Sequence, residues 1–299
     1  MEGLPSEQVA HKMTRRNFLG AAAAAGAVAA VPNTLTAASE TYEAETSDSQ
    51  WFDYEVHDRM EKYQRDLEFF VEKVSAVHAD TEGLSVSRYV SEHFYIDGAS
   101  EALQTYFRQY AVGMTFTESR GDVYRVSNQG AMGILQMMPE EWKRLADPDM
   151  NPVSVADAVA VSSRLASEKY HSLIRNCATE LDLIRDAHFG GDQVLFDLQF
   201  MGPLVINAYH SGEGNMRAIV RHFAEHFTAP EATEFALDQS QIMSGRDVYY
   251  LAIHDAYNQA AASSYGEYSL GYVFEVYAAY RVFRNRLNQE QRETLLASL

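Results

Sequence analysis

The chain has 299 residues, of which 46% are hydrophobic and 12% aromatic, and its formal net charge is −18. This length and apolar content suffice for one or two domains with a hydrophobic core, and they exclude an intrinsically disordered chain. The acidic surface would repel nucleic acid and anionic lipid, so we expect neither as a partner. The single cysteine, Cys177, excludes an intramolecular disulfide and a C-x-x-C metal site.

The N-terminus has the pattern of an export signal of the twin-arginine type. Arg15 and Arg16 precede Asn-Phe-Leu-Gly, an Ala-rich apolar stretch follows to Val31, and residues 36–38 (Thr-Ala-Ala) offer a small-residue cleavage site. The apolar stretch is about a dozen residues long, short of the ~20 that span a bilayer. We therefore expect residues 1–38 to be removed, no stable membrane insertion afterwards, and a protein that acts in the periplasm or cell envelope.

Beyond the signal, the sequence predicts helices and no convincing strand. Residues 39–54 are rich in Ser, Thr and Glu and are interpreted as a linker. In several later segments apolar residues recur every three or four positions, which is the pattern of amphipathic helices. Residues 122–127 fit either a short strand or a turn, and Gly190-Gly191 interrupts the chain. The predicted helices are residues 55–77, 103–114, 155–175, 203–210, 216–227 and 272–283.

Glu118 lies at or just past the end of the predicted helix 103–114, and a loop rich in glycine follows it. A glutamate in such a position is most often a solvated surface charge. The apolar neighbours Met114, Phe116 and Met132 could instead desolvate the carboxyl group, and desolvation raises its pKa. A carboxyl group that keeps its proton near neutral pH can serve as a general acid.

The stretch that begins at Glu118, ESRGDVYRVSNQGAMGILQMMP, resembles a family signature. The signature is E-S-x-x-x-x-x-x-x-S-x-x-G-A-x-G-L-x-Q-x-M-P, which is typical of the soluble lytic transglycosylases, relatives of goose-type lysozyme. Asn151-Pro152 stands where that family has its NP pair. The residues in register are Glu118, Ser119, Ser127, Gly130, Ala131, Gly133, Gln136 and Pro139.

Later motifs of the same family follow in the expected order. NAYHSGEGNM at residues 207–216 resembles A-Y-N-A-G-x-G, although His210 and Ser211 replace the family's Asn and Ala. EYSLGYV at residues 267–273 resembles E-T-x-x-Y-V. The resemblance covers residues 98–285, and within it residues 176–200 and 228–262 look like insertions.

The resemblance implies a mostly α fold with a lysozyme-like (SLT-type) helical catalytic domain at residues 98–299. Residues 39–97 would be the linker and an N-terminal helical extension. The implied reaction is cleavage of the β-1,4 bond between N-acetylmuramic acid and N-acetylglucosamine in peptidoglycan, with formation of 1,6-anhydromuramyl ends. The implied partners are peptidoglycan glycan strands, and we expect a monomer that needs no cofactor and no metal.

The resemblance also implies roles for individual side chains. Glu118 would be the single catalytic acid and base. The flexible backbone at Gly130 and Gly133 would let a glycan strand approach. From the residues alone, the amide of a loop glutamine and the hydroxyl of a helix tyrosine could equally brace the protein itself. The implied substrate-binding residues are Ser127, Met132, Gln136, Tyr209, Glu267 and Tyr272.

Two other classes of function stay open. His222-Phe-Ala-Glu-His226 fits H-x-x-E-H, the inverted zinc-protease pattern, and a helix would place His222 and His226 on one face for zinc. A third ligand is required, and no downstream motif indicates one. The other alternative is a glycan-binding scaffold that has lost its activity.

Replacing Arg15 and Arg16 together by lysine tests the export signal. Because the twin-arginine route requires the arginine pair, we expect the precursor to accumulate in the cytoplasm. Cell fractionation and immunoblotting of the precursor and the mature form measure this, and unaltered export of the double variant would exclude the twin-arginine assignment.

Overall fold

The computed structural model describes residues 50–228 and 245–297, and all structural statements below concern these residues. They belong to a compact unit, Ser47–Leu299. The regular elements in this part of the chain are helices, and the extended backbone forms only isolated bridges. The prediction of a mostly helical fold with an N-terminal helix is confirmed. The signal segment and residues 39–49 of the linker lie outside the described residues.

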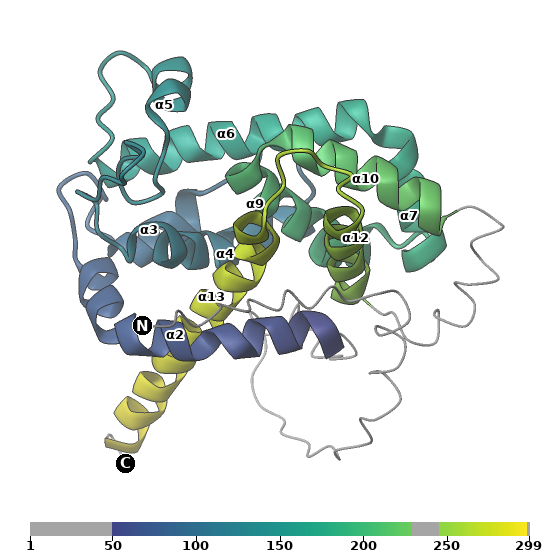
Figure 1. Cartoon of the computed structure of the whole chain (residues 1–299). Helices are drawn as coiled ribbons and strands as arrows, with labels where there is room; N and C mark the ends of the chain where they lie inside the picture. The colour runs from purple at the N-terminus through teal and green to yellow at the C-terminus, as the bar shows by residue number, and fades with distance from the viewer. Residues whose placement is uncertain (1–49, 229–244, 298–299) are drawn as a thin grey trace, which may run out of the picture. The chain divides into compact units, whose positions relative to one another are not determined.

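The predicted helices are all present, most with bounds that shift by a few residues, whereas the last one extends well beyond residue 283, to Ala297 (Figure 1). The helices α3, α5, α7, α8 and α12 and the π-helix η2 are not predicted from the sequence pattern. Residues 122–127 form turns, with an isolated bridge from Val126 to Met132 rather than a strand. The helices are α2 (Gln50–Ser75), α3 (Val86–His93), α4 (Glu101–Ser119), α5 (Pro139–Leu145), α6 (Val155–Asn176), α7 (Ala178–Phe189), α8 (Gln193–Phe196), the π-helix η2 (Asp197–Met201), α9 (Gly202–Ser211), α10 (Glu213–Phe227), α12 (Arg246–Asn258) and α13 (Glu267–Ala297).

Local sequence explains where the principal helices begin and end. The Ser100 and Ser154 hydroxyls cap α4 and α6 by accepting backbone N–H groups, as short polar side chains do at helix N-termini. α4 ends at Arg120, which is left-handed with φ 58°. Glu118 therefore lies inside the last turn of α4. Of the predicted insertions, residues 176–200 contain α7 and α8, and residues 228–262 contain α12, with residues 229–244 outside the described part of the chain.

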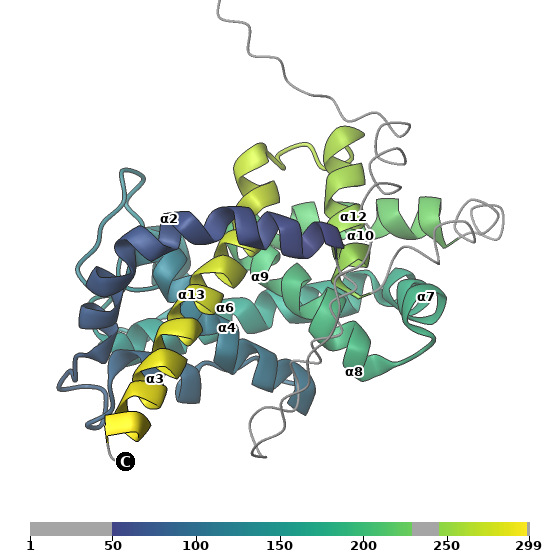
Figure 2. The same ribbon diagram turned by 90° about the horizontal axis from the view of Figure 1, so that it is seen from below.

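The longest helix, α13, runs beside α2 and α4 in both views of the ribbon (Figures 1 and 2). The α4–α13 crossing is close because Gly113 has no side chain. A Cβ atom at that position would collide with the backbone carbonyl of Val276 and lie 3.0 Å from the Cβ of Tyr280. The close approach of these backbones holds the end of α4 against the first half of α13.

The N-terminal helix α2 packs directly on the end of α4. Phe70 stacks on Phe116 with ring centroids 3.9 Å apart, and Tyr63 meets the same ring edge-on at 4.9 Å. At the other end of α2, the buried Asp247 carboxylate of α12 accepts the backbone N–H of Phe52 at 2.9 Å. The extension is thus part of the core that supports the segment containing Glu118.

Replacing Gly113 by alanine should destabilise the protein. The added methyl group meets backbone atoms of α13, which cannot rotate away, so we expect a loss of about 1–3 kcal/mol. Gly214→Ala is the control, because nothing lies within 4 Å of a Cβ at that helical position and alanine favours helix. Thermal unfolding followed by circular dichroism compares them, and equal melting temperatures would contradict the close-crossing argument.

Candidate active site

Glu118 is part-buried in the last turn of α4, and its carboxyl group has one direct side-chain partner. The Tyr272 hydroxyl of α13 donates to Glu118 Oε1 at 2.5 Å. Burial raises the pKa of Glu118 to about 7, while the Tyr272 hydrogen bond and the positive charge of Arg125 act in the opposite direction. A carboxyl group with this pKa is partly protonated at neutral pH, so it can give up a proton and take one back.

The neighbours of Glu118 come from distant parts of the chain. Tyr272 is buried in α13, and Arg125 is exposed on the loop that follows α4. Tyr209 of α9 and Tyr268 of α13 are also close enough for the Glu118 charge to raise their pKa values. The site therefore joins the first motif, the tyrosine of the second motif and the start of α13.

The loop after α4 is held together mainly by its own backbone. Val126 and Met137 both form bridges with Met132. The Ser127 hydroxyl accepts the backbone N–H of Ala131 at 3.0 Å. Gly133 has φ 78°, and a Cβ there would collide with the Pro152 carbonyl. The side of Gly133 that was expected to admit a glycan strand is thus occupied by the NP segment of the protein.

Gln136 braces this loop. Its side-chain nitrogen donates to the Gly133 carbonyl at 2.8 Å and to the Arg125 carbonyl at 3.0 Å. Its backbone is also left-handed, with φ 48°, a conformation that the two hydrogen bonds stabilise. Both N–H groups of the amide are engaged within the protein, which leaves the side-chain oxygen for a substrate contact. Ser127 and Met132 lie in the same loop, and Met132 is part-exposed.

Tyr209 connects the first motif to the helices beneath it. Its hydroxyl donates to the Leu135 carbonyl at 3.0 Å and lies 3.1 Å from the Ser162 hydroxyl of α6. Its ring packs against a small cluster of buried residues that includes Met137, and Trp142 packs against the same cluster. The hydroxyl is satisfied inside the protein, so the bracing role that the sequence left open is the one seen here.

Glu267 and Tyr268 occupy different positions relative to the site. Glu267 is exposed in the first turn of α13, and the groups that act on the pKa of Glu118 do not include it. Tyr272 is five positions after Glu267 but four after Tyr268, and residues four apart share one face of a helix. Sequence reasoning missed Tyr268, although this spacing is visible in EYSLGYV.

His210, which departs from the second motif, also reaches the site. Its ring stacks on Tyr272 with centroids 4.1 Å apart and an interplanar angle of 12°. It meets the Tyr268 ring edge-on at 5.0 Å. Burial lowers the pKa of His210 to about 4, so the imidazole is uncharged at neutral pH.

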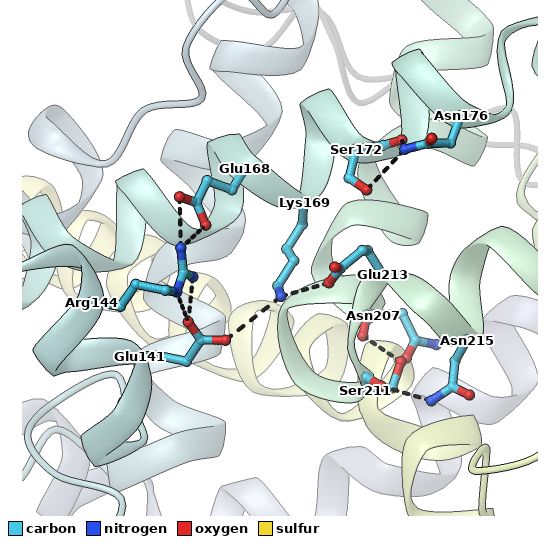
Figure 3. A network of polar contacts seen from close by, with 10 residues as sticks. All are labelled: Glu141, Arg144, Glu168, Lys169, Ser172, Asn176, Asn207, Ser211, Glu213 and Asn215. Carbon is cyan, nitrogen blue, oxygen red and sulfur yellow. Dashed lines mark hydrogen bonds and ion pairs between the residues drawn. The ribbon is translucent and has the colours of Figure 1, made fainter.

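A polar network joins the segments that follow the first and second motifs (Figure 3). Lys169 of α6 reaches Glu213 at the start of α10 at 2.6 Å and Glu141 of α5 at 3.8 Å. Arg144 of α5 in turn contacts Glu141 and Glu168. Because Lys169 is mostly buried, this bridge is screened less by solvent than a surface pair, and it fixes α5 relative to α10.

The second motif is anchored by its own side chains. The buried Asn207 amide donates to the Tyr249 and Tyr265 hydroxyls at 2.8 and 2.7 Å. The Ser211 hydroxyl donates to the Asn207 carbonyl, and the Asn215 amide donates to the Ser211 carbonyl (Figure 3). These bonds tie α9 to α10 across Gly212 and set the position of His210.

The histidines of the H-x-x-E-H string have partners within the protein. His222 Nε2 lies 2.8 Å from Asp255 Oδ2, and His226 Nδ1 lies 2.8 Å from the His222 carbonyl. Across residues 50–228 and 245–297, no group of three or more His, Cys, Asp or Glu side chains is placed to hold a metal ion. Cys177 is buried and unpaired with another cysteine.

Two segments of the chain match models of known protein families. Residues 105–227 match the Transglycosylase SLT domain, which supports lytic transglycosylase-type activity on peptidoglycan in general. Residues 12–32 match the TAT (twin-arginine translocation) pathway signal sequence. The chain thus carries an SLT transglycosylase domain behind a signal for export by the twin-arginine route. The SLT match contains Glu118, His210 and Tyr209 but ends before α13, which supplies Tyr272.

Comparisons with curated proteins and with solved structures gave no match. In the described part of the chain, no helix combines the length and apolarity that crossing a membrane requires.

Replacing Tyr272 by phenylalanine should raise the pKa of Glu118 further. The hydroxyl hydrogen bond favours the carboxylate, and its loss leaves the desolvation of the charge uncompensated, so we expect a rise of about one unit. Tyr265→Phe is the control, because that hydroxyl bonds Asn207 rather than Glu118. NMR titration of ¹³C-labelled glutamate carboxyl groups measures both, and an unchanged or lower pKa in Tyr272→Phe would refute the assignment.

Replacing Glu118 by glutamine should change how stability depends on pH. The pKa of Glu118 is raised by folding, so ionisation favours the unfolded chain as pH rises from about 4.5 to about 7. Glutamine cannot ionise, so the variant should gain melting temperature relative to the parent protein over this interval and keep the gain at pH 8. Differential scanning calorimetry at pH 5 and pH 8 measures the melting temperature of the variant minus that of the parent protein. A difference that falls as the pH rises would contradict the prediction.

Proposed function

We propose that the protein is a lytic transglycosylase with a single catalytic carboxyl group, Glu118. Its substrate is the glycan strand of peptidoglycan, and it cleaves the β-1,4 bond between N-acetylmuramic acid and N-acetylglucosamine. The observation that carries the proposal is the raised pKa of a part-buried carboxyl group held by Tyr272 at the junction of the motifs. We further propose that the mature protein acts in the periplasm or cell envelope.

The groups that set the pKa of Glu118 are compatible with a reaction that uses one carboxyl group. Most glycosidases use a pair of Asp or Glu residues about 5–9.5 Å apart, one as acid and one as base or nucleophile. In the described part of the chain, the side chains that act on the pKa of Glu118 are Tyr272 and Arg125, and neither is a carboxylate. One carboxyl group that changes protonation state twice is sufficient for lytic transfer.

In the first step, protonated Glu118 donates its proton to the glycosidic oxygen, and the bond from that oxygen to C1 of the muramyl sugar breaks. N-acetylglucosamine leaves as an alcohol, and the N-acetyl group of the muramyl sugar supports the positive charge at C1. The Glu118 carboxylate that results is stabilised by the Tyr272 hydroxyl and by the positive charge of Arg125.

In the second step, the Glu118 carboxylate takes the proton from the 6-hydroxyl of the same muramyl sugar. The oxygen attacks C1 and closes the 1,6-anhydro ring, and Glu118 is again protonated. No water enters the product. A pKa near 7 suits both steps, because the driving forces for giving and taking the proton are then similar at neutral pH.

The remaining assignments stay proposals. Ser127, Met132 and Gln136 would border the glycan groove on the first-motif loop. Tyr209 and Tyr272 would contribute mainly by holding that loop and the acid, and Glu267 would act at the exposed rim. The chain would divide into a signal at residues 1–38, a linker and helical extension at 39–97, and a catalytic domain at 98–299.

Glu118→Gln tests the mechanism. Glutamine keeps the size and hydrogen-bonding capacity of the side chain but has no transferable proton, so the rate should fall by about 10²–10⁴. Mass spectrometry of products from purified peptidoglycan measures anhydromuropeptides, and circular dichroism confirms folding. His226→Ala, at an exposed position of the H-x-x-E-H string, is the control and should retain full turnover.

The products separate the alternatives. Reducing ends in place of anhydro ends would show hydrolysis, and released peptides that depend on His226 and disappear with chelators would show a zinc peptidase. An absence of products with retained binding would show a glycan-binding scaffold. Near-native turnover by folded Glu118→Gln would exclude the single-carboxyl mechanism.

A further inference from the structure

Tyr268 differs from the other tyrosines near Glu118 in its exposure. Its side chain is 72% exposed, whereas Tyr272, one helical turn later, is only 2% exposed. Both lie on one face of α13, and both are close enough for the Glu118 charge to raise their pKa values. An exposed aromatic side chain is common on a protein surface, but this one borders the carboxyl group proposed to act on a sugar chain.

The exposed ring is supported from behind. His210 of α9 stacks on the buried Tyr272 ring at 4.1 Å and meets Tyr268 edge-on at 5.0 Å. Tyr272 is in turn fixed by its hydrogen bond to Glu118. The rings of Tyr272, His210 and Tyr268 thus form a continuous aromatic series, the aromatic wall, that runs from the acid to solvent.

The position of His210 within the wall is built into the fold. It follows Tyr209, whose hydroxyl is bonded to Leu135, and it precedes Ser211, which is bonded to Asn207. These contacts hold the backbone on both sides of His210. A side chain whose conformation is set before binding loses little entropy when a ligand packs on it.

We propose that Tyr268, backed by His210, is a sugar-binding subsite on which the apolar face of a pyranose ring packs next to the bond that Glu118 protonates. This proposal rests on the proposed function, because it places a glycan strand at Glu118. A pyranose presents C–H groups on its faces and hydroxyl groups at its edge. An aromatic ring buries the face and leaves the edge hydroxyls in water, so the contact stabilises binding without desolvating polar groups.

The chemistry of His210 fits this role. Burial keeps its pKa near 4, so the imidazole serves as an uncharged ring at neutral pH. A cation at this position would lower the pKa of Glu118, so a smaller fraction of the carboxyl group would carry its proton at neutral pH. Histidine in its neutral form therefore extends the aromatic wall without disturbing the acid.

The departures from the family pattern meet at this wall. His210 stands where the second motif has Asn. When Tyr272 is taken as the tyrosine of the third motif, Tyr268 stands where that motif has Glu. The two side chains that replace the family's Asn and Glu, His210 and Tyr268, are in contact with each other. This contact supports binding of the sugar by ring packing at this position.

The test measures binding in the Glu118→Gln background, so that turnover does not interfere. The probe is chitotetraose, a neutral β-1,4-linked oligomer of N-acetylglucosamine, titrated by calorimetry into the mature chain. Tyr268→Ala should raise the Kd roughly 3- to 10-fold, the range that corresponds to the loss of one aromatic packing contact. Tyr268→Phe, which keeps the ring, should bind within about twofold of the parent. Tyr54→Ala, at a position 69% exposed in α2, should change nothing.

His210 variants separate ring support from polarity. His210→Phe keeps an uncharged ring behind Tyr268 and should retain affinity, whereas His210→Ala removes the support and should weaken binding as Tyr268→Ala does. Because His210 acts through Tyr268, the double variant His210→Ala/Tyr268→Ala should bind no more weakly than Tyr268→Ala alone. Additive losses would overturn the arrangement.

The outcomes also distinguish this proposal from the proposed function. Chitotetraose binding that depends on the Tyr268 ring supports the subsite even if no anhydro product is ever formed. Anhydro product formation with equal Kd for Tyr268→Ala and the parent overturns the subsite and leaves the mechanism intact. If Tyr268→Phe loses as much affinity as Tyr268→Ala, the hydroxyl rather than the ring makes the contact. If the protein binds neither chitotetraose nor sedimented glycan strands, the subsite proposal is overturned.

Discussion

The hydrogen bond from Tyr272 to Glu118 is the contact on which the rest of the site depends. It joins α4 to α13, and it is made where Gly113 allows the two helix backbones to approach closely. Burial at this crossing removes water from the carboxyl group and raises its pKa, and the tyrosine hydroxyl limits the rise. The same crossing therefore holds the acid in place and sets the pH range in which it carries a proton.

The helices around this contact support the end of α4 that carries Glu118. α2 packs on Phe116, two residues before Glu118, and is itself held by Asp247 of α12. Neither α2 nor α12 falls within residues 105–227, the segment that matches the SLT domain. The segments outside the family match thus complete the core around the acid, which a helical domain ending at α10 would leave uncovered on the α13 side.

Several side chains that the sequence motifs associate with substrate make hydrogen bonds within the protein instead. Gln136 and Tyr209 use their polar groups to hold the loop after α4, and Gly133 leaves room for the Pro152 carbonyl. The loop also buries apolar side chains, among them Ile134, Leu135 and Met137, and the hydrogen bonds satisfy the polar backbone groups that lie between them. The polar side chains of the motif thus hold the backbone of the loop in the structure.

The sequence by itself determined the export signal, the helical class and the position of Glu118 near the end of a helix, while the structure extended that helix to Ser119. These features depend on local order, namely paired arginines before an apolar run and apolar residues at helical spacing. Only the tertiary structure decided that Tyr268 lies close enough for the Glu118 charge to act on it, that His210 packs against both Tyr268 and Tyr272, and that α2 packs on α4. Those relations join residues separated by tens to hundreds of positions, and they follow from helix crossings that no local pattern specifies.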